Sequence, residues 1–100
     1  MDIQQLMKQA QKMQRDAEKM DAELKEKVYV GTAGGEAVKI EMDGGYTVKS
    51  IQIEDGVSED KEMLIEMLTL ALNQVLESIN EDKEDSMSSL TKGMSLPGVF

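Results

Sequence analysis

The sequence predicts an α+β domain: a long N-terminal helix, a three-stranded antiparallel sheet and a long C-terminal helix, working as a homodimer. Three observations lead to this fold. Apolar residues recur at alternating steps of three and four over residues 3–24. Residues 28–53 alternate with period two between glycine-rich turns. Residues 63–79 form a helical pattern with an unusually wide apolar face. One hundred residues is the length of one domain.

The first helix is expected from about Asp2 to Lys27, with an acid at its start and basic residues in its last turn. Its apolar residues occupy the a and d positions of a coiled-coil heptad, a set that we call the seam: Ile3, Leu6, Ala10, Met13, Ala17, Met20 and Leu24. An apolar seam this narrow does not stabilise a helix alone, so the helix must pack on another surface.

The β-region is expected to begin at Val28 and to be interrupted by turns at Gly31 and at Gly34-Gly35. Residues 37–42 alternate clearly between apolar and charged side chains. Val38, Ile40 and Met42 should share one face, as in a half-buried strand.

A tight hairpin is expected at residues 43–45, an Asp-Gly-Gly sequence whose residues tolerate positive φ. The returning strand should cover residues 46–53. Its alternation slips between Val48 and Ile51, which predicts a β-bulge near Lys49-Ser50.

Ser58 is expected to cap the second long helix, whose first turn is rich in acids. The apolar face over residues 63–79 is about twice the 100° that a surface helix needs, and a second copy of the chain is the simplest way to cover it. The predicted dimer interface consists of Leu64, Leu68, Leu72, Val75 and Leu76. Gly93 and Pro97 should end the helix, which leaves one domain over residues 1–92 and a flexible tail over 93–100.

The charge is unevenly distributed along the chain. The net charge is −9, yet residues 3–15 contain three basic residues and no acid. Lys8, Lys12, Arg15 and Lys19 follow one another at steps of four, three and four residues and fall on heptad positions f and c, away from the seam. We call these four residues the basic stripe. Several glutamines on nearby faces could donate hydrogen bonds to phosphates.

The residue inventory argues against an enzyme or a metal protein. The chain has no cysteine and no histidine, so thiolate sites and the usual general base are absent. The acids Glu54-Asp55 lack a third ligand or a base partner and are read as the start of a loop. We therefore expect no cofactor, no metal and no small-molecule substrate. No apolar run suggests a signal peptide or a membrane span, so we expect a cytoplasmic location without membrane contact.

Four stretches of the sequence, in this order and spacing, resemble the YbaB/EbfC family of bacterial nucleoid-associated proteins. They are residues 6–14 (LMKQAQKMQ), the pair Gly34-Gly35 before residues 38–40, residues 58–64 (SEDKEML) leading to residues 71–73, and residues 93–98 (GMSLPG). The resemblance implies a homodimer whose helices project like tweezers. It also implies sequence-tolerant binding of double-stranded DNA, which would fall on the basic stripe.

Two functional interpretations follow. The first is an architectural DNA-binding protein of the nucleoid, with one basic stripe per subunit on the duplex backbone. The alternative is a protein-interaction adaptor that docks an acidic partner on the same stripe. No aromatic residue lies near the stripe and no base-reading motif is present, so we expect little sequence specificity.

Overall fold

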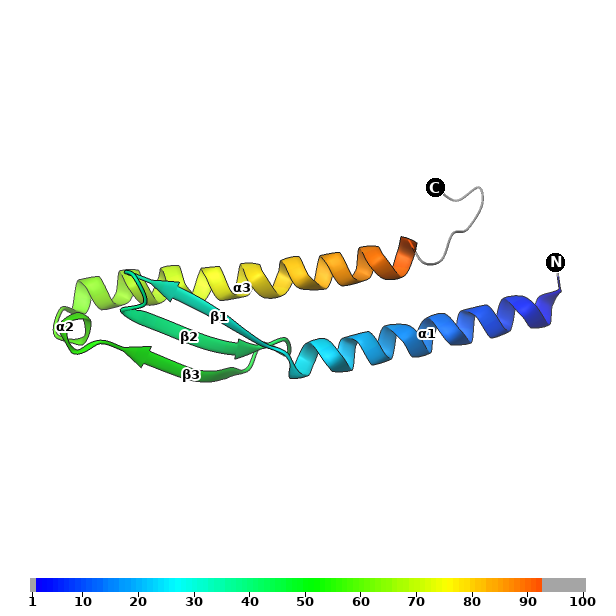
Figure 1. The fold of residues 1–100 in the computed structure, drawn as a ribbon, viewed down its shortest axis with the longest axis horizontal. Helices are drawn as coiled ribbons and strands as arrows, with labels where there is room; N and C mark the ends of the chain where they lie inside the picture. The colour runs from blue at the N-terminus through cyan, green and yellow to red at the C-terminus, as the bar shows by residue number, and fades with distance from the viewer. Residues whose placement is uncertain (1, 93–100) are drawn as a thin grey trace.

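The computed structural model describes residues 2–92, and the predicted tail at 93–100 lies outside them. The elements are α1 (Ile3–Glu26), β1 (Val28–Ala33), β2 (Val38–Asp43), β3 (Val48–Ile53), the short α2 (Asp55–Ser58) and α3 (Lys61–Lys92). The strands form one antiparallel sheet in the order β1-β2-β3, with α3 lying across it (Figure 1). The predicted α+β fold is thus confirmed.

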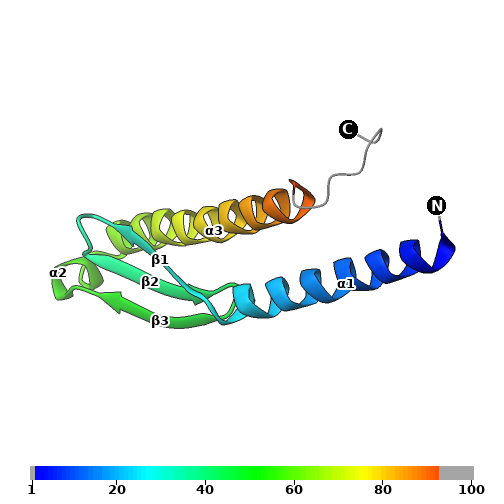
Figure 2. The same ribbon diagram turned by 45° about the vertical axis from the view of Figure 1, so that its right-hand side comes forward.

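Helix α1 has nearly the predicted bounds. The Asp2 side chain caps it by accepting a hydrogen bond from the N–H of Gln4 at 3.2 Å. Leu24 is buried, Ala17 and Met20 are half-buried, and Ile3 is 72% exposed. Both views show why: the helix leaves the end of the sheet and extends beside the far half of α3 (Figure 2). Much of the seam is therefore uncovered within one chain.

Gly31 does not form a turn, as the sequence analysis expected, but lies within β1 opposite Ile40. A Cβ at Gly31 would lie 2.1 Å from the carbonyl oxygen of Ala71 in α3. The residue is therefore a point of close approach between sheet and helix, where a side chain would separate the two. The turn predicted at Gly34-Gly35 is confirmed, and both residues have positive φ.

The core lies between α3 and the first two strands. Val38, Ile40 and Met42 are all buried on one face of β2, as predicted. They pack with Ala71, Val75 and Ile79 of α3, each of which is fully buried. A fully buried aliphatic side chain of this size contributes about 1.5–3 kcal/mol, so this layer supplies much of the stability of one chain.

The turn between β2 and β3 is organised by Asp43. Its Oδ1 accepts hydrogen bonds from the N–H groups of Gly45 at 2.9 Å and Thr47 at 3.0 Å. The bond from Thr47 is the main cause that lowers the pKa of Asp43, with smaller contributions from Gly45 and Lys49. The hairpin is where the sequence places it, but the positive φ falls on Tyr46 rather than on the glycines.

The bulge predicted near Lys49-Ser50 is confirmed. Glu41 lies opposite Ser50, and the next residue, Met42, lies opposite Val48. Lys49 is therefore the extra residue of β3. This extra residue is the reason why the apolar alternation slips between Val48 and Ile51.

The assignment of Ser58 as the cap of the second long helix is wrong. Ser58 ends α2, and its hydroxyl donates to the carbonyl of Asp55 at 2.8 Å. The cap of α3 is Asp60, whose Oδ1 accepts a hydrogen bond from the N–H of Met63 at 3.1 Å. Both residues are good caps, and the short helix between strand and helix decides which one is used.

Candidate nucleic-acid interface and dimer surface

The basic stripe lies along the outside of α1. All four side chains are exposed, whereas the seam residues Ala17, Met20 and Leu24 turn toward the body and are less accessible. From Lys8 to Lys19 the stripe spans about 16 Å at 1.5 Å per residue. Projected on the axis of a duplex, that length covers roughly five nucleotides of one strand. The structure therefore keeps the predicted stripe together on one rigid element.

The stripe residues take no part in the ion pairs of the described chain. The ion pairs lie elsewhere: Lys25 with Asp21 at 3.1 Å, Lys27 with Asp82 at 2.8 Å, Lys39 with Glu41 at 3.7 Å and Lys49 with Asp43 at 3.4 Å. Within residues 2–92 no stripe side chain has a hydrogen-bond or ion-pair partner. Its four cations are therefore available to an external anion.

One acid lies beside Arg15 of the stripe. Glu18 lines a shallow depression on α1 together with Gln11, Gln14 and Arg15. Gln14 donates to Glu18 Oε1 at 3.4 Å, which uses one of the two N–H groups of its amide. Residues 15 and 18 are three apart and therefore lie side by side on the helix surface. The carboxylate weakens the positive field at the centre of the stripe.

The base of α1 is joined to α3 by three residues that we call the joint: Lys27, Tyr29 and Asp82. Lys27 Nζ lies 2.8 Å from Asp82 Oδ2, and the Tyr29 hydroxyl donates to the same oxygen at 2.5 Å. Lys27 Nζ also lies 5.3 Å from the centre of the Tyr29 ring. No sequence pattern indicates this cluster, because Asp82 lies more than fifty residues from Lys27 and Tyr29.

Titration of the joint follows from these contacts. The hydrogen bond from Lys27, followed by that from Tyr29, holds the pKa of Asp82 below its usual range. Burial, assisted by Asp82, raises the pKa of Tyr29 to about 12. Near neutral pH the joint therefore contains an ionised carboxylate at Asp82 and a protonated phenol at Tyr29.

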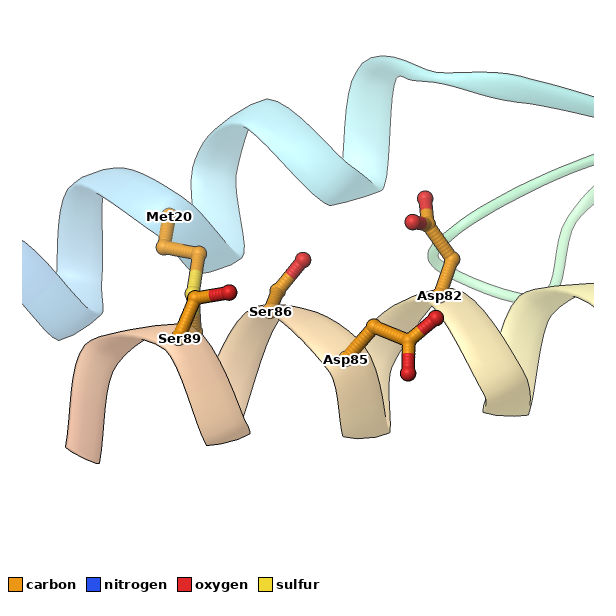
Figure 3. Close-up of a pocket in the computed structure, with 5 residues that line it drawn as sticks. All are labelled: Met20, Asp82, Asp85, Ser86 and Ser89. Carbon is orange, nitrogen blue, oxygen red and sulfur yellow. The ribbon is translucent and has the colours of Figure 1, made fainter. Parts of the chain in front are cut away.

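Beyond the joint, α1 and α3 are separated by an open cleft. Met20 of α1 points toward Ser89 of α3, while Asp82, Asp85 and Ser86 line the α3 side (Figure 3). An apolar side chain thus faces a largely polar wall. Little apolar packing holds α1 to α3 along this stretch.

A second exposed surface lies on β3. Paired residues of neighbouring strands share a face, so Val48, Ile51 and Ile53 of β3 point to the side that α3 covers. Helix α3 packs on β1 and β2, and the three side chains remain 44%, 51% and 36% exposed. Part of the apolar face of the sheet is therefore open in one chain.

One flank of α3 borders this open part of the sheet. Asn80 accepts a hydrogen bond from the Tyr46 hydroxyl at 2.7 Å, and Lys83 Nζ lies 4.1 Å from the centre of the Tyr46 ring. Tyr46 belongs to the β2–β3 turn, so this flank faces β3. Helical spacing places three further residues on it, which we call the apolar flank: Ile65, Leu72 and Leu76.

The predicted dimer residues separate into two groups. Leu64, Leu68 and Leu76 are half-buried, and Leu72 is 38% exposed, so these four retain surface for a partner. Val75 is fully buried against the sheet of its own chain. We therefore remove Val75 from the predicted interface. Ile65 and the three β3 residues, which the sequence analysis did not include, are better placed.

Within residues 2–92, no group of three or more acids is arranged to hold a metal ion. None of the helices in the described chain combines the length and the apolar character that crossing a membrane requires.

The sequence profile of the YbaB/EbfC DNA-binding family matches residues 1–94. A nucleoid-associated protein of Clostridium novyi is 43% identical over 102 residues, which cover all of this chain and 90% of the relative. A nucleoid-associated protein of Clostridium kluyveri is 42% identical over 97 residues, covering 95% of this chain and 85% of the relative.

A solved structure shares the fold. An uncharacterized protein from Helicobacter pylori superposes with a TM-score of 0.81, covering 91% of this chain and 98% of the other. The two sequences are 24% identical, so this likeness concerns the fold alone.

Proposed function

The chain belongs to the YbaB/EbfC DNA-binding family, and we propose that it binds double-stranded DNA as a homodimer, with little sequence specificity and an architectural role in the nucleoid. The observation that carries the proposal is the basic stripe: four exposed cations, without acid partners in the described chain, on a projecting helix. It gives the DNA-binding function of the family a physical basis in a chain of net charge −9.

The stripe suits phosphates rather than bases. Each lysine would act as a point charge and Arg15 as a planar fork toward the phosphate oxygens. Neutralising a phosphate releases condensed counterions, which supplies affinity that does not depend on sequence. No aromatic residue lies on α1 to stack on unpaired bases. Duplex binding with low specificity follows.

A homodimer would double the stripe and cover the open apolar surface. In the described chain α3 packs on β1 and β2 rather than on β3, and the apolar flank of α3 lies beside the exposed side chains of β3. If a second copy places its α3 over β3, two-fold symmetry brings the two α3 helices side by side between the two sheets. Each α3 would then be covered on two sides, which accounts for its wide apolar face.

A binding titration tests the proposal. The pure protein is added to random-sequence duplex DNA over a series of salt concentrations. We expect log affinity to fall against log salt with a slope between about −3.6 and −7.2, the range for four to eight phosphates. A single strand of the same length should bind more weakly. An unlabelled duplex of any one defined sequence should compete no better than random-sequence duplex. No binding at low salt would contradict the proposal and favour the adaptor interpretation.

A further inference from the structure

The direction of α1 depends on very few contacts. Leu24 is the residue of this helix that is buried, and the cleft above it is lined by polar groups of α3. The carbonyl of Leu24 is pressed against Gly44, where a Cβ would lie 1.8 Å from its oxygen. The N–H of Gly44 donates to the carbonyl of Lys27 at 3.0 Å. These contacts fix the end of the helix but leave its tilt to other interactions.

The joint supplies a tie at the correct place. Lys27 is the C-terminal cap of α1, Tyr29 is the second residue of β1, and Asp82 projects from α3. One carboxylate oxygen therefore links the helix end, the sheet and the second helix. Tyr29 is only 8% exposed, so one side of this tie is held rigidly in the core.

A small change at this joint produces a large displacement at the tip. The 24 residues of α1 extend about 36 Å at 1.5 Å per residue. A tilt of about 10° at the base would move the tip by about 6 Å, nearly two steps of the 3.4 Å rise per base. Placing several cations on successive phosphates therefore requires a fixed tilt.

We infer that Asp82 is a positioning residue for DNA binding: through Lys27 and Tyr29 it sets the tilt of α1 and hence the direction in which the basic stripe is presented. The expected effect on DNA binding rests on the proposed function, whereas the effect of Asp82 on the tilt of α1 does not. The inference leads to a counterintuitive expectation. Removing a negative charge normally strengthens binding to DNA, whereas removing this one should weaken it.

Glu84 provides a matched control for Asp82. It lies two residues further along α3, is exposed, and its side chain has no hydrogen-bond or ion-pair partner in the described chain. Asp82→Asn and Glu84→Gln therefore make the same change in net charge. Only the first weakens the tie, because it replaces the charge-assisted hydrogen bonds from Lys27 and Tyr29 with neutral ones.

The tilt itself can be measured without DNA. The chain has no cysteine, so Gln4→Cys on α1 and Ser88→Cys on α3 give two unique sites for spin labels. Labelled chains are mixed with an excess of unlabelled protein. Pulsed electron paramagnetic resonance then measures the distance between the two labels of one chain. We expect one narrow distance distribution in the wild type and in Glu84→Gln. Asp82→Asn and Tyr29→Phe should broaden or shift it, and Asp82→Glu should largely restore it.

Affinity for random duplex DNA is then measured for the same variants. If disengaging the joint leaves the competent tilt about one third populated, the affinity of Asp82→Asn falls about threefold. Glu84→Gln should bind as tightly as the wild type or more tightly. Circular dichroism checks that each variant is folded, and Tyr29→Phe, which removes one oxygen atom, serves as the second test if Asp82→Asn unfolds.

The outcomes separate the two proposals. A distance distribution in Asp82→Asn and Tyr29→Phe that matches the wild type would overturn the positioning role, whatever the DNA result. Equal affinities of Asp82→Asn and Glu84→Gln, despite a broadened distribution, would also overturn it. Absence of DNA binding in every protein, the wild type included, would reject the proposed function, while the distances would still decide whether the joint sets the tilt.

Discussion

The two long helices of this chain differ in how they are held, although both are amphipathic. Helix α3 buries Ala71, Val75 and Ile79 completely against the sheet. Helix α1 buries Leu24 at its base and leaves seam residues such as Met13 exposed. One helix is thus part of the core, and the other is an arm. The buried sector of α3 packs within the chain, whereas the narrow seam of α1, with unpaired cations on its outer side, leaves a surface for an external partner.

The largest effects on stability should occur in α3. Ile79→Ala should lower the free energy of unfolding by about 2–5 kcal/mol, because it leaves a cavity in the only large apolar layer of the described chain. Met13→Ala on α1 should change it by less than about 0.5 kcal/mol, because that side chain is 40% exposed. Urea denaturation followed by circular dichroism measures both. Similar losses in the two variants would show that α1 is packed as firmly as α3.

Association should depend on one flank of α3 only. Leu72→Asp places a charge on the apolar flank and should convert a dimer into monomers, since an unpaired carboxylate in an interface costs several kcal/mol. Leu70→Asp is the matched control. It is 55% exposed, and helical spacing places it on the side of α3 turned away from the sheet.

Sedimentation at micromolar concentration measures both variants. The wild type and Leu70→Asp should have about twice the mass of one chain. A wild-type monomer, or dissociation by Leu70→Asp alone, would reject the proposed dimer surface.

The joint should make stability depend on pH at both extremes. The pKa of Asp82 is lowered in the folded protein, so its stabilising effect is complete above the ordinary carboxyl pKa of about 3.9 and is lost as the pH falls below it. The pKa of Tyr29 is raised to about 12, so its effect is complete below about pH 10 and is lost as the pH rises toward 12.

Denaturation midpoints measured from pH 2 to 5 and from pH 9 to 12 test this dependence. Asp82→Asn should reduce the acid-side loss, and Glu84→Gln should leave it unchanged. An acid-side loss of the same size in Asp82→Asn would show that other carboxylates, Asp43 among them, account for it.

The smallest effect concerns the acid beside the stripe. Glu18→Gln removes the carboxylate next to Arg15 and should strengthen duplex binding by about two- to threefold, the usual range for an exposed charge pair. Glu66→Gln, an equal charge change on the exposed side of α3, should have little effect. Fluorescence anisotropy at low salt measures both. An equal gain in the two variants would indicate a general effect of net charge.

Local patterns predicted those features that depend on neighbouring residues. The seam, the strand around Ile40 and the bulge at Lys49 all come from periodicity, which has a fixed meaning within a helix or strand. The role of Gly31 could not be predicted, because it depends on where α3 crosses the sheet. The choice of Asp60 over Ser58 as a cap depends on a four-residue helix too short to leave a periodic pattern.

In the candidate site, too, features set by neighbouring residues could be predicted, and features set by tertiary packing could not. The basic stripe could be read from the sequence because its members occupy successive turns of one helix. The joint could not, because Asp82 meets Lys27 and Tyr29 only through the packing of α3 on the sheet. Val75 was misassigned to the dimer interface because the sequence shows that a helix face is apolar, but not which sector its own sheet covers.

The most direct test replaces three lysines of the arm, α1, in one protein and three lysines of the sheet and α3 in another. Lys8, Lys12 and Lys19 are changed together to Gln, and a control protein carries the same change at Lys39, Lys49 and Lys61. Both proteins lose three positive charges per chain. Circular dichroism should show that both remain folded, since glutamine is a good helix former.

The slope of log affinity for random duplex DNA against log salt is then compared with that of the wild type. The arm variant should lose three to six phosphate contacts per dimer, and its slope should become shallower by about 3 to 5. The control should keep nearly the wild-type slope. An arm variant with the wild-type slope, or a control that loses as much, would contradict the claim that α1 is the surface that meets DNA.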